Sequence, residues 1–562
     1  KQNKMETIML KKLAAIIIMV FTFSLANAQY CITNQFNFGG SENDAPYSII
    51  KIADGYVMGG YTNSHDGDFN VPHNHDVDAF IAKFDFNHNL IWQHTYGGKE
   101  FDGLVSIKST DDGGFIAGGL TSSNDDDVSG HHGGRYDTWV IKFNSLGILQ
   151  WQRCYGGKAV DYAYEIHVVP GGYQVVGTTT SNNDGDVPVN HGGYDAWLLT
   201  ISSTGTVVSS YCYGGSGDDE MAGISSNTNG TSTFNAATFS NDGQVSGNHG
   251  NRDIWLVNID NNSGNIIWQK CIGGSANDIP HTIARTVDGN IVLSITSNSS
   301  NGDFIGSGSP SGCVAGFTPK LMKVNPETGA VIWNRNYPHP NRCAGSLGAI
   351  VTTDGGILSL GVITDNPGIE SKFDGYVFKV DADGNMLWDK ILGGSKSDIN
   401  ITHLLAGIEI NNQYLIPFTS QSRDGDILNP LGGADGWMVT LGTGCNQSFA
   451  EVGESSHSFE QVAKSSQSFA PEKESNPSNE VAIFPNPLTN TTTISFSLTQ
   501  SQKVSLKIFD VNGRLVKTLA DRLFEAGENK IEWNAAEENA GIYFLRIEAG
   551  DYSATEKLSV FK

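Results

Sequence analysis

Short apolar or alternating runs recur in groups of four along most of the chain. In one group they are Leu104–Ser109, Gly114–Thr121, Thr138–Phe143 and Leu149–Tyr155, each rich in Val, Ile, Phe, Trp and Tyr and bounded by Gly, Asp or Asn. Such runs predict β-strands. Asp112-Gly113, between the first two runs, supplies the positive φ of a tight hairpin turn. Because no helical period appears in these groups, the pattern predicts repeated units of four strands.

A three-residue flag, an apolar residue followed by Gly-Gly, closes most groups. Successive flags are 58, 59, 58, 59 and 120 residues apart, and the last interval spans two periods because the flag between them, near 337–345, is degenerate. Seven units of four strands predict an all-β fold, a seven-bladed β-propeller, rather than a solenoid, which would need capping units. The flags are Phe38-Gly39-Gly40, Tyr96-Gly97-Gly98, Tyr155-Gly156-Gly157, Tyr213-Gly214-Gly215, Ile272-Gly273-Gly274 and Leu392-Gly393-Gly394.

The two ends of the repeat region, residues 29–445, complement each other. The first repeat residues, 34–40, match the fourth strand of other units, whereas the last unit stops after its third strand, Gly436–Leu441. We therefore expect the N-terminal strand to complete the last blade and close the ring. In a closed ring Cys31 and Cys445 occupy adjacent positions of one hairpin turn, where a disulfide would contribute roughly 2–4 kcal/mol.

The remaining cysteines fall into two groups. Cys313 and Cys343 flank an irregular sixth unit and could form a second disulfide. Cys154, Cys212 and Cys271 hold the same repeat position in three successive units, which places them too far apart for the ~7 Å limit on the Cα separation of a disulfide. We interpret these three as small buried hydrophobic residues rather than as a metal site.

The N-terminal segment has the pattern of a signal peptide. Lys11 and Lys12 precede an apolar run, Leu13–Leu25, that is too short to span a bilayer, and Ala26-Asn27-Ala28 is a small-x-small cleavage site. We expect residues 1–28 to be removed after Ala28, with the mature chain in an oxidising compartment and without a transmembrane segment.

Charge narrows the range of partners. The chain of 562 residues has a formal net charge of −25. This balance argues against nucleic acid and anionic membrane surfaces, because both require basic patches. Acidity usually serves solubility, although it is also compatible with bound Ca²⁺.

Composition changes sharply after the repeats. Residues 446–480 are rich in Ser and Glu with few apolar positions, which predicts a disordered linker. Alternating strands then return in residues 481–562, with turns at Asn512-Gly513, Ala526-Gly527 and Ala549-Gly550. This pattern predicts a small Ig-like β-sandwich.

Several motifs of residues 481–562 carry a resemblance to a known family. They are Pro485-Asn486-Pro487, the run Lys503–Leu519, Ala526-Gly527 with Trp533, and Gly541–Arg546. Together they resemble the type A C-terminal sorting domain of the type IX secretion system. The repeats themselves are similar to those of bacterial extracellular propeller-like proteins, which implies a fold and almost nothing about chemistry.

The sorting-domain resemblance implies a route of export. It implies a Bacteroidota-like source, Sec passage to the periplasm and outer-membrane translocation through the type IX machinery, which would be the partner of residues 481–562. Such a domain is usually removed on export, so the cargo would be secreted or anchored to surface lipopolysaccharide. An ordinary Ig-like adhesion module is the alternative for this segment.

Paired acidic residues follow the second strand of several units. Asp66 with Asp68, Asp184 with Asp186, and Asp424 with Asp426 offer closely spaced hard oxygens of the kind that suit Ca²⁺, although the spacing is not that of an EF-hand. Asp and Asn also cap turns through their own backbone hydrogen bonds. Because a motif repeated in most blades usually serves the blade, turn capping is the simpler interpretation and calcium the alternative.

Three other repeated sets have structural and functional interpretations. Histidines in equivalent loops could bind Zn²⁺ or Cu²⁺, but a ring spreads them apart, so hydrogen bonding is simpler. One aspartate at the start of each third strand either caps backbone N–H groups or lines a channel mouth. For the fourth-strand tryptophans, packing between blades is a simpler interpretation than quinone binding. The sets are His75, His132, His191 and His249; Asp78, Asp137, Asp195, Asp253, Asp374 and Asp435; and Trp92, Trp151, Trp268, Trp333 and Trp388.

The sequence favours a non-catalytic binding or adhesion module for glycan or protein, because propeller faces offer many loops on a rigid ring. An extracellular polysaccharide hydrolase or lyase that uses paired face carboxylates is one alternative. A structural surface component is another. The divergent sixth unit, with its long Asn298–Pro319 loop, departs from the repeat and is therefore a place to look for a site.

Overall fold

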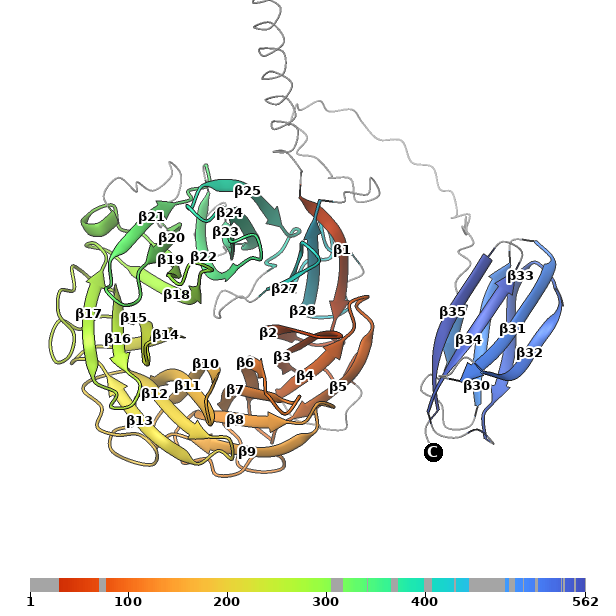
Figure 1. Cartoon of the computed structure of the whole chain (residues 1–562), viewed down its shortest axis with the longest axis horizontal. Coiled ribbons are helices and arrows are strands. Elements are labelled where there is room, and N and C mark those ends of the chain that lie inside the picture. The colour runs from red at the N-terminus through yellow and green to blue at the C-terminus, as the bar shows by residue number, and fades with distance from the viewer. Residues whose placement is uncertain are drawn as a thin grey trace, which may run out of the picture. The chain divides into compact units, whose positions relative to one another are not determined.

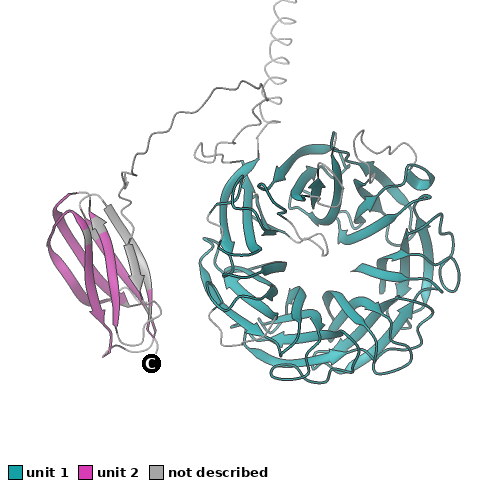
Figure 2. Cartoon of the chain, turned by 180° about the vertical axis from the view of Figure 1, so that it is seen from behind, with its two compact units in different colours: residues 1–454 teal, residues 455–562 magenta. Residues whose placement is uncertain are grey.

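The computed structural model divides the chain into two compact units, residues 1–454 and 455–562, shown in teal and magenta in Figure 2. The residues it describes are 30–69, 77–304, 317–340, 342–364, 372–398, 407–428, 431–443, 481–484, 491–498, 500–510, 514–536, 538, 541–549 and 552–560. Ala28, Cys313, Cys445 and the predicted signal peptide and linker lie outside these residues.

The described strands of the first unit form seven four-stranded antiparallel sheets, numbered here in chain order. Sheet 1 is β2 (Asp44–Ile52), β3 (Gly55–Thr62), β4 (Asp78–Phe84) and β5 (Leu90–Tyr96); sheet 2 is β6 (Asp102–Ser109), β7 (Phe115–Thr121), β8 (Asp137–Phe143) and β9 (Leu149–Tyr155); sheet 3 is β10 (Asp161–Val169), β11 (Gly172–Thr179), β12 (Asp195–Ser202) and β13 (Val207–Tyr213); sheet 4 is β14 (Asp219–Ser226), β15 (Thr231–Thr238), β16 (Asp253–Asp260) and β17 (Ile266–Ile272).

The later sheets repeat this order. Sheet 5 is β18 (Asp278–Arg285), β19 (Ile291–Ser297), β20 (Thr318–Val324) and β21 (Val331–Asn336); sheet 6 is β22 (Cys343–Val351), β23 (Ile357–Thr364), β24 (Asp374–Val380) and β25 (Met386–Leu392); sheet 7 is β26 (Ile408–Ile410), β27 (Gln413–Ser420), β28 (Asp435–Gly442) and β1 (Cys31–Phe38). A single turn of 3-10 helix, η1 (Gly302–Phe304), follows β19.

The seven sheets follow one another around a ring, with the first strand of each nearest the ring axis and the fourth at the circumference (Figure 1). Because each sheet is an antiparallel meander, its first and third strands begin, and its second and fourth end, at the same face of the ring. We call this the link face. It carries the long loops between second and third strands and the Gly-Gly links that lead from one sheet to the next.

The N-terminal strand closes the ring, as its sequence predicts. β1 pairs antiparallel with β28, with Gln35 opposite Val439 and Phe38 opposite Gly436. A buried hydrophobic cluster joins sheet 7 to sheet 1 through Phe38, Met438 and residues of β2–β4. Similar clusters join the other neighbouring sheets, so the core lies between sheets rather than within one layer.

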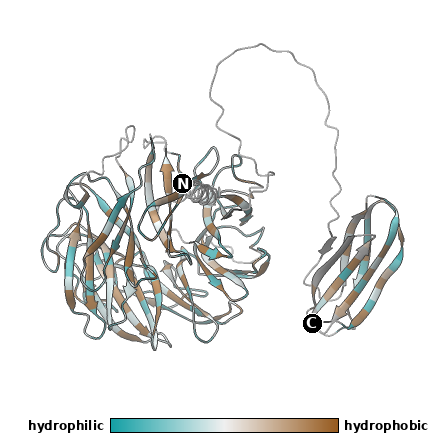
Figure 3. Ribbon diagram, turned by 45° about the horizontal axis from the view of Figure 1, so that its top comes forward, coloured by the Kyte–Doolittle hydropathy of each residue, from teal (hydrophilic) through white to brown (hydrophobic). Residues whose placement is uncertain are grey.

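The middle strands are apolar on both faces because each sheet is covered by a neighbour on either side. β8 is buried at all seven residues, and its Trp139 is completely buried, with Nε1 donating to Gln152 Oε1 at 2.9 Å. Trp197, Trp255 and Trp437 occupy equivalent buried positions on the third strands. Apolar residues, in brown, accordingly recur along the strands (Figure 3).

The second unit consists of two antiparallel sheets around one core. One sheet is β29 (Val481–Phe484), β30 (Thr491–Leu498) and β33 (Gly527–Asn534); the other is β32 (Leu515–Phe524), β31 (Gln502–Asp510), β34 (Gly541–Ala549) and β35 (Tyr552–Val560). Phe496 and Trp533 of the first sheet share a buried cluster with Leu506 and Leu545 of the second. Alternation of Val504, Leu506 and Ile508 with less buried neighbours gives β31 its core face.

The expected all-β class and the repeated four-stranded sheets are confirmed. The strands differ from expectation mainly at their starts: β6 begins at Asp102 rather than Leu104, because Asp102 is buried and belongs to the strand. Among the described residues no helix has the length and apolar character needed to cross a membrane.

Candidate functional site

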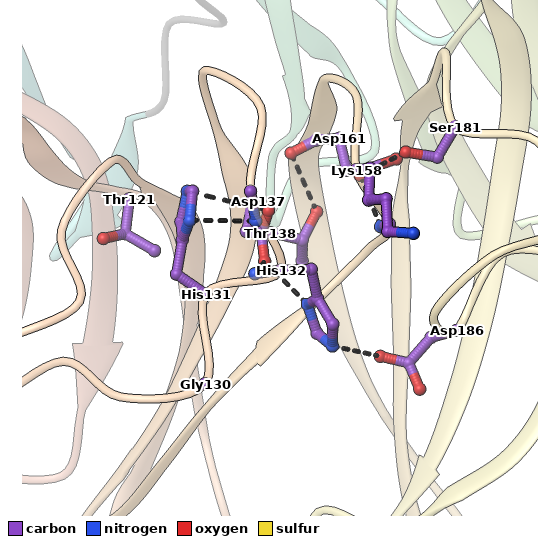
Figure 4. A network of polar contacts seen from close by, with 12 residues as sticks. Thr121, Gly130, His131, His132, Asp137, Thr138, Lys158, Asp161, Ser181 and Asp186 are labelled. Atoms are coloured by element: carbon purple, nitrogen blue, oxygen red, sulfur yellow. Dashed lines mark hydrogen bonds and ion pairs between the residues drawn. The ribbon is translucent and has the colours of Figure 1, made fainter.

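In six of the seven sheets a buried aspartate, at or before the start of the inner strand, holds the Gly-Gly link that precedes it. At the junction of sheets 2 and 3, Asp161 Oδ2 accepts hydrogen bonds from Gly157 N at 2.8 Å and from Ser181 Oγ at 2.9 Å. Thr179 Oγ1 donates to Asp161 Oδ1. Ser181 Oγ also accepts from Ala159 N at 3.0 Å, so one carboxylate and one hydroxyl fix the whole turn (Figure 4).

The same arrangement recurs in six of the seven sheets, and we call these residues the junction aspartates. In sheet 6 their position is held by Cys343, which is disulfide-bonded and lies opposite Thr364 just as Asp44 lies opposite Thr62. The junction aspartates are Asp44, Asp102, Asp161, Asp219, Asp278 and Asp398, all with completely buried side chains.

The paired loop aspartates predicted as calcium ligands accept hydrogen bonds from backbone N–H groups of the same link. In sheet 1, Asp66 Oδ1 accepts from Ser41 N at 2.7 Å and Asp68 Oδ2 from Gly39 N at 3.0 Å. Gly67, between them, has φ 67°, and a Cβ there would lie 2.4 Å from Gly39 O. The loop therefore requires glycine at this point to approach the link.

The other two predicted pairs behave similarly. In sheet 7, Asp424 Oδ1 accepts from Ser395 N at 2.6 Å and Asp426 Oδ2 from Gly393 N at 3.0 Å. In sheet 3, both Asp184 oxygens lie 3.3 Å from Lys158 N. Asp186 instead turns towards the preceding sheet, with Oδ2 3.9 Å from His132 Nε2 (Figure 4).

These contacts fit turn capping better than metal binding. Calcium takes six to eight oxygen ligands, whereas most of the predicted carboxylates already accept backbone N–H groups. Within the described part of the chain, no cluster of three or more His, Cys, Asp or Glu side chains is arranged to hold a metal ion. Calcium at Asp66, Asp68, Asp184, Asp186, Asp424 and Asp426 stays a prediction.

Histidine–aspartate pairs lie at the start of the third strand in sheets 2, 3 and 4. His132 Nδ1 lies 2.7 Å from Asp137 Oδ2, which also accepts from His132 N at 2.8 Å (Figure 4). His191 with Asp195 and His249 with Asp253 repeat this geometry at 2.6 and 2.7 Å. The third-strand aspartates therefore cap the loop backbone, which is the structural role their repetition favours; each histidine belongs to a different sheet.

Two carboxylates face each other across the first glycine of several links. A Cβ at Gly214 would lie 2.7 Å from Asp219 Oδ2 and 2.8 Å from Asp195 Oδ1, so only glycine fits between them. Burial, opposed by hydrogen bonds and reinforced by the Asp78 charge, raises the pKa of Asp102 to about 6. These buried, repeated carboxyl groups contact the Gly-Gly links.

An unbroken series of aromatic ring contacts crosses the link face from sheet 1 to sheet 3, and we call it the aromatic arc. Successive ring centroids are 5.4, 5.7, 5.9, 5.6 and 6.3 Å apart. Apart from the first, which is 9 % exposed, the rings are half-buried, so each packs against the protein and also meets solvent. In order they are Tyr47, Tyr61, Phe101, Tyr136, Tyr162 and Tyr164.

Charged groups lie beside this arc. The Arg135 guanidinium carbon lies 5.0 Å from the Tyr136 ring centroid. In sheet 4, Arg252 donates from NH2 to Glu220 Oε1 at 2.7 Å and stacks over the Phe239 ring at 4.8 Å. Glu220, the second residue of β14, holds in sheet 4 the position that Tyr162 holds in sheet 3. Burial, together with the negative charge of Glu220, raises the pKa of Tyr164.

A further polar group departs from the repeat on the inner strands. The Glu165 carboxylate lies 3.3 Å from Lys108 Nζ and 3.0 Å from His167 Nε2. Ser48 and Thr282, also four residues after a junction aspartate, instead accept hydrogen bonds from the next inner strand. Burial opposes ionisation of Glu165, but the charges of His167 and Lys108 outweigh it and lower the pKa to about 2.

The cysteines and the fourth-strand tryptophans, which are the remaining candidates, lie in surroundings that fit structural roles. Cys154, Cys212 and Cys271 are free and buried, and burial raises the pKa of each thiol, so they are unreactive hydrophobic residues. Cys31 and Cys343 are disulfide-bonded; their predicted partners, Cys445 and Cys313, lie outside the described residues. The fourth-strand Trp268 donates from Nε1 to Glu327 O of the next sheet at 2.7 Å, which is a packing role.

Comparison with known proteins identifies the second unit. Residues 482–561 match the family of secretion system C-terminal sorting domains, which confirms the resemblance carried by this segment. The chain is therefore type IX secretion cargo, exported to the medium or to the outer-membrane surface, and this unit interacts with the secretion machinery.

Several solved structures resemble the chain distantly. BBS1N in complex with ARL6DN shares 10% identity at a TM-score of 0.39, covering 73% of this chain and 96% of that one. Cobalt-substituted Synechocystis apocarotenoid oxygenase shares 11% sequence identity at a TM-score of 0.32, and the match covers 64% of this chain and 94% of that one. The mannose phosphorylase MPT-4 from Leishmania mexicana shares 10% sequence identity at a TM-score of 0.26, and the match covers 49% of this chain and 81% of that one. No curated protein matches significantly. Scores this low establish neither a ligand nor a chemistry.

The sequence interpretation missed the junction aspartates and the aromatic arc. Each junction aspartate stands five residues after the first glycine of a flag, as Asp161 follows Gly156, so a search for residues at fixed distance from the flags would find the set. The arc has no such signal, because Phe101, Tyr136 and Tyr162 occupy different repeat positions that meet only in the folded ring.

Proposed function

We propose that this exported chain is a seven-bladed β-propeller that binds a glycan without converting it, followed by an Ig-like sandwich that directs export. The proposed boundaries are a signal peptide over 1–28, a propeller over 29–445, a linker over 446–480 and a sorting domain over 481–562. Export to the cell surface or medium places the propeller where extracellular polysaccharide is available.

The observation that carries the proposal is the aromatic arc. Tyrosine and phenylalanine rings present apolar faces on which the C–H faces of a sugar can pack, and tyrosine hydroxyls can donate to and accept from sugar hydroxyls. Half-buried rings such as Tyr136 and Tyr162 are held by the sheets in advance, so little conformational entropy is lost on binding.

The carboxyl environments favour binding over hydrolysis. Glycoside hydrolases need one carboxyl group that is protonated near working pH and a second that is ionised, on either side of the scissile bond. Asp102, whose pKa is raised, is completely buried and bonded to Gly98 N and Ser123 Oγ. Glu165 is ionised and tied to Lys108 and His167. Neither group has the freedom that a catalytic acid requires.

The test is a polysaccharide panel. We expect the exported chain to be retained by at least one immobilised glycan, in the presence of calcium and equally in the presence of a chelator, because the arc needs no metal. Retention that disappears with chelator would instead support the calcium prediction for the paired loop aspartates. No retention in either condition would contradict glycan binding and favour a protein ligand or a structural role.

A further inference from the structure

We infer that the ligand is a linear, uncharged glycan chain that lies across sheets 1–4, rather than a single terminal sugar held at the ring axis. This inference rests on the proposed glycan-binding function and specifies the class of glycan. It depends on the extent of the aromatic arc, on its restriction to one side of the ring, and on the charges around it.

The extent of the arc exceeds what one sugar can cover. Tyr61, Phe101 and Tyr136 belong to different segments of sheets 1 and 2, and their centroids are separated by 5.7 and 5.9 Å. A pyranose ring is similar in size to a tyrosine ring, so it stacks on one of these side chains and leaves the others uncovered. Only a chain of sugar units uses successive rings.

Three rings of the arc, Tyr61, Phe101 and Tyr162, have no aromatic counterpart among the described residues of the other sheets. Tyr136, which immediately precedes the third strand of sheet 2, is less distinctive, because Tyr194 of sheet 3 and Phe373 of sheet 6 hold the same position. Tyr162, the second residue of the inner strand of sheet 3, stands where sheets 1 and 2 have Ala45 and Gly103. A ligand on the axis would meet equivalent positions of all sheets alike, whereas departures confined to neighbouring sheets indicate a site that runs along the face.

The polar end of the arc suits neutral hydroxyl groups. Glu220 and Arg252 form a paired acceptor and donor 2.7 Å apart, with Phe239, 45 % exposed, stacked against the guanidinium. Such a pair can accept from one sugar hydroxyl and donate to its neighbour. The Glu220 charge is neutralised locally by Arg252, but an acidic glycan would still approach a chain whose net charge is −25, so long-range repulsion disfavours it.

The experiment measures affinity against chain length. The probe is a series of oligosaccharides, from the monosaccharide upward, prepared from the neutral polysaccharide that the panel retains. We expect affinity to rise at least tenfold along the series, about 1.4 kcal/mol, before it reaches a plateau. Binding as tight for the monosaccharide as for the longest member would overturn the inference while leaving glycan binding intact; an exported chain that retains no glycan would overturn both.

Variants locate the chain on the arc. Tyr61→Ala should weaken binding of the longest oligosaccharides, leave the shortest bound members unchanged, and so move the plateau to a shorter length. Phe101→Leu, which keeps an apolar side chain in place, should act in the same direction if Tyr61→Ala proves unstable.

A matched control separates binding from stability. Tyr211 is half-buried on the outer strand β13, 6.3 Å from the Tyr213 ring and outside the arc. Tyr211→Ala should leave the whole length series unchanged. Equal losses in Tyr61→Ala and Tyr211→Ala, or tighter retention of an acidic polysaccharide such as alginate, would overturn the inference.

Discussion

At the scale of single residues, the junction aspartates are the buried carboxylates that accept hydrogen bonds from the Gly-Gly links of the ring. Asp102 accepts from Gly98 N at 2.7 Å and from Ser123 Oγ at 2.8 Å while fully buried. Removal of its carboxylate leaves both donors without a partner, and an unsatisfied buried donor costs about 1–3 kcal/mol. The near approach of the Asp78 charge offsets part of this stabilisation.

We predict that Asp102→Ala lowers the free energy of unfolding of the first unit by about 2–4 kcal/mol, and that Asp102→Asn lowers it less because one acceptor remains. Denaturant unfolding measures both. Asp125→Ala is the control: its carboxylate is 38 % exposed and accepts from Lys99 N and Lys99 Nζ, donors that water can satisfy after the substitution, so the loss should stay within about 1 kcal/mol. Equal losses at Asp102 and Asp125 would contradict the account.

The same residues give stability a pH dependence. Burial raises the pKa of Asp44 and of Asp102 to about 6 in the folded chain, against about 3.9 when unfolded. Between these values the folded chain holds protons that the unfolded chain has released. The contribution of Asp44 and Asp102 to the free energy of unfolding is therefore fully present below pH 4 and is lost as the pH rises through 6.

We predict that the melting temperature of the first unit falls between about pH 4 and pH 6, the window between the unfolded and folded pKa values, and falls less in Asp102→Asn. Thermal unfolding across this range measures the effect. Asp112→Asn is the control, because hydrogen bonding to Lys142 lowers the pKa of Asp112 to about 2 and it does not titrate in this window. An Asp102→Asn curve parallel to that of the original chain would refute this assignment.

At the scale of elements, the loop after the second strand forms a clasp on the preceding Gly-Gly link in six of the seven sheets; in sheet 6 most of this loop lies outside the described residues. The clasp depends on glycine where two backbones approach. Gly185 has φ 56°, and a Cβ there would lie 2.0 Å from Gly156 O. Gly113, in a hairpin turn, has φ 79° with nothing within 4 Å of its Cβ position.

We predict that Gly185→Ala destabilises the first unit at least twice as much as Gly113→Ala. The hairpin variant suffers only the strain of a left-handed backbone, about 1–2 kcal/mol, whereas the loop variant must also move the link. Chemical denaturation compares them. Similar losses would show that the loop is not held against the link.

Most of the fold could be predicted from the sequence, because strand patterns and flags are local. The four strands of a unit, the match between residues 34–40 and a fourth strand, and the sorting domain all depend on residues close together in the chain. The start of β6 was misplaced because Asp102-Gly103 has the composition of a turn, and only burial between two sheets shows that it begins a strand.

The candidate site was far less predictable. The paired loop aspartates were visible, but whether their oxygens face an ion or a backbone N–H depends on the neighbouring link, which is about 25 residues away in the case of Asp66 and Ser41. The arc depends on rings such as Tyr61 and Phe101 from separate sheets meeting at one face. Sequence spacing carries no information about such contacts.

At the scale of the whole molecule, ring closure rests on β1. This strand pairs with β28 and carries the disulfide-bonded Cys31 at its start. A cross-link at the seam reduces the entropy of the open chain and so opposes its release.

We predict that Cys31→Ser lowers the stability of the first unit by roughly 2–4 kcal/mol, and that peptide mapping without reductant links Cys31 to Cys445 and Cys343 to Cys313. Thermal unfolding with and without reductant is the accompanying measurement. A Cys31→Ser chain that melts with the original, or a map that joins other cysteines, would contradict closure by this disulfide.

The export domain and the arc together make the central claim, an exported ring that binds glycan on its link face. The most direct measurement is the affinity of the retained glycan for Tyr162→Ala and for Tyr211→Ala by calorimetry. The account predicts at least a tenfold loss for Tyr162→Ala and an unchanged affinity for Tyr211→Ala, with both chains folded. Unchanged affinity in Tyr162→Ala would contradict it.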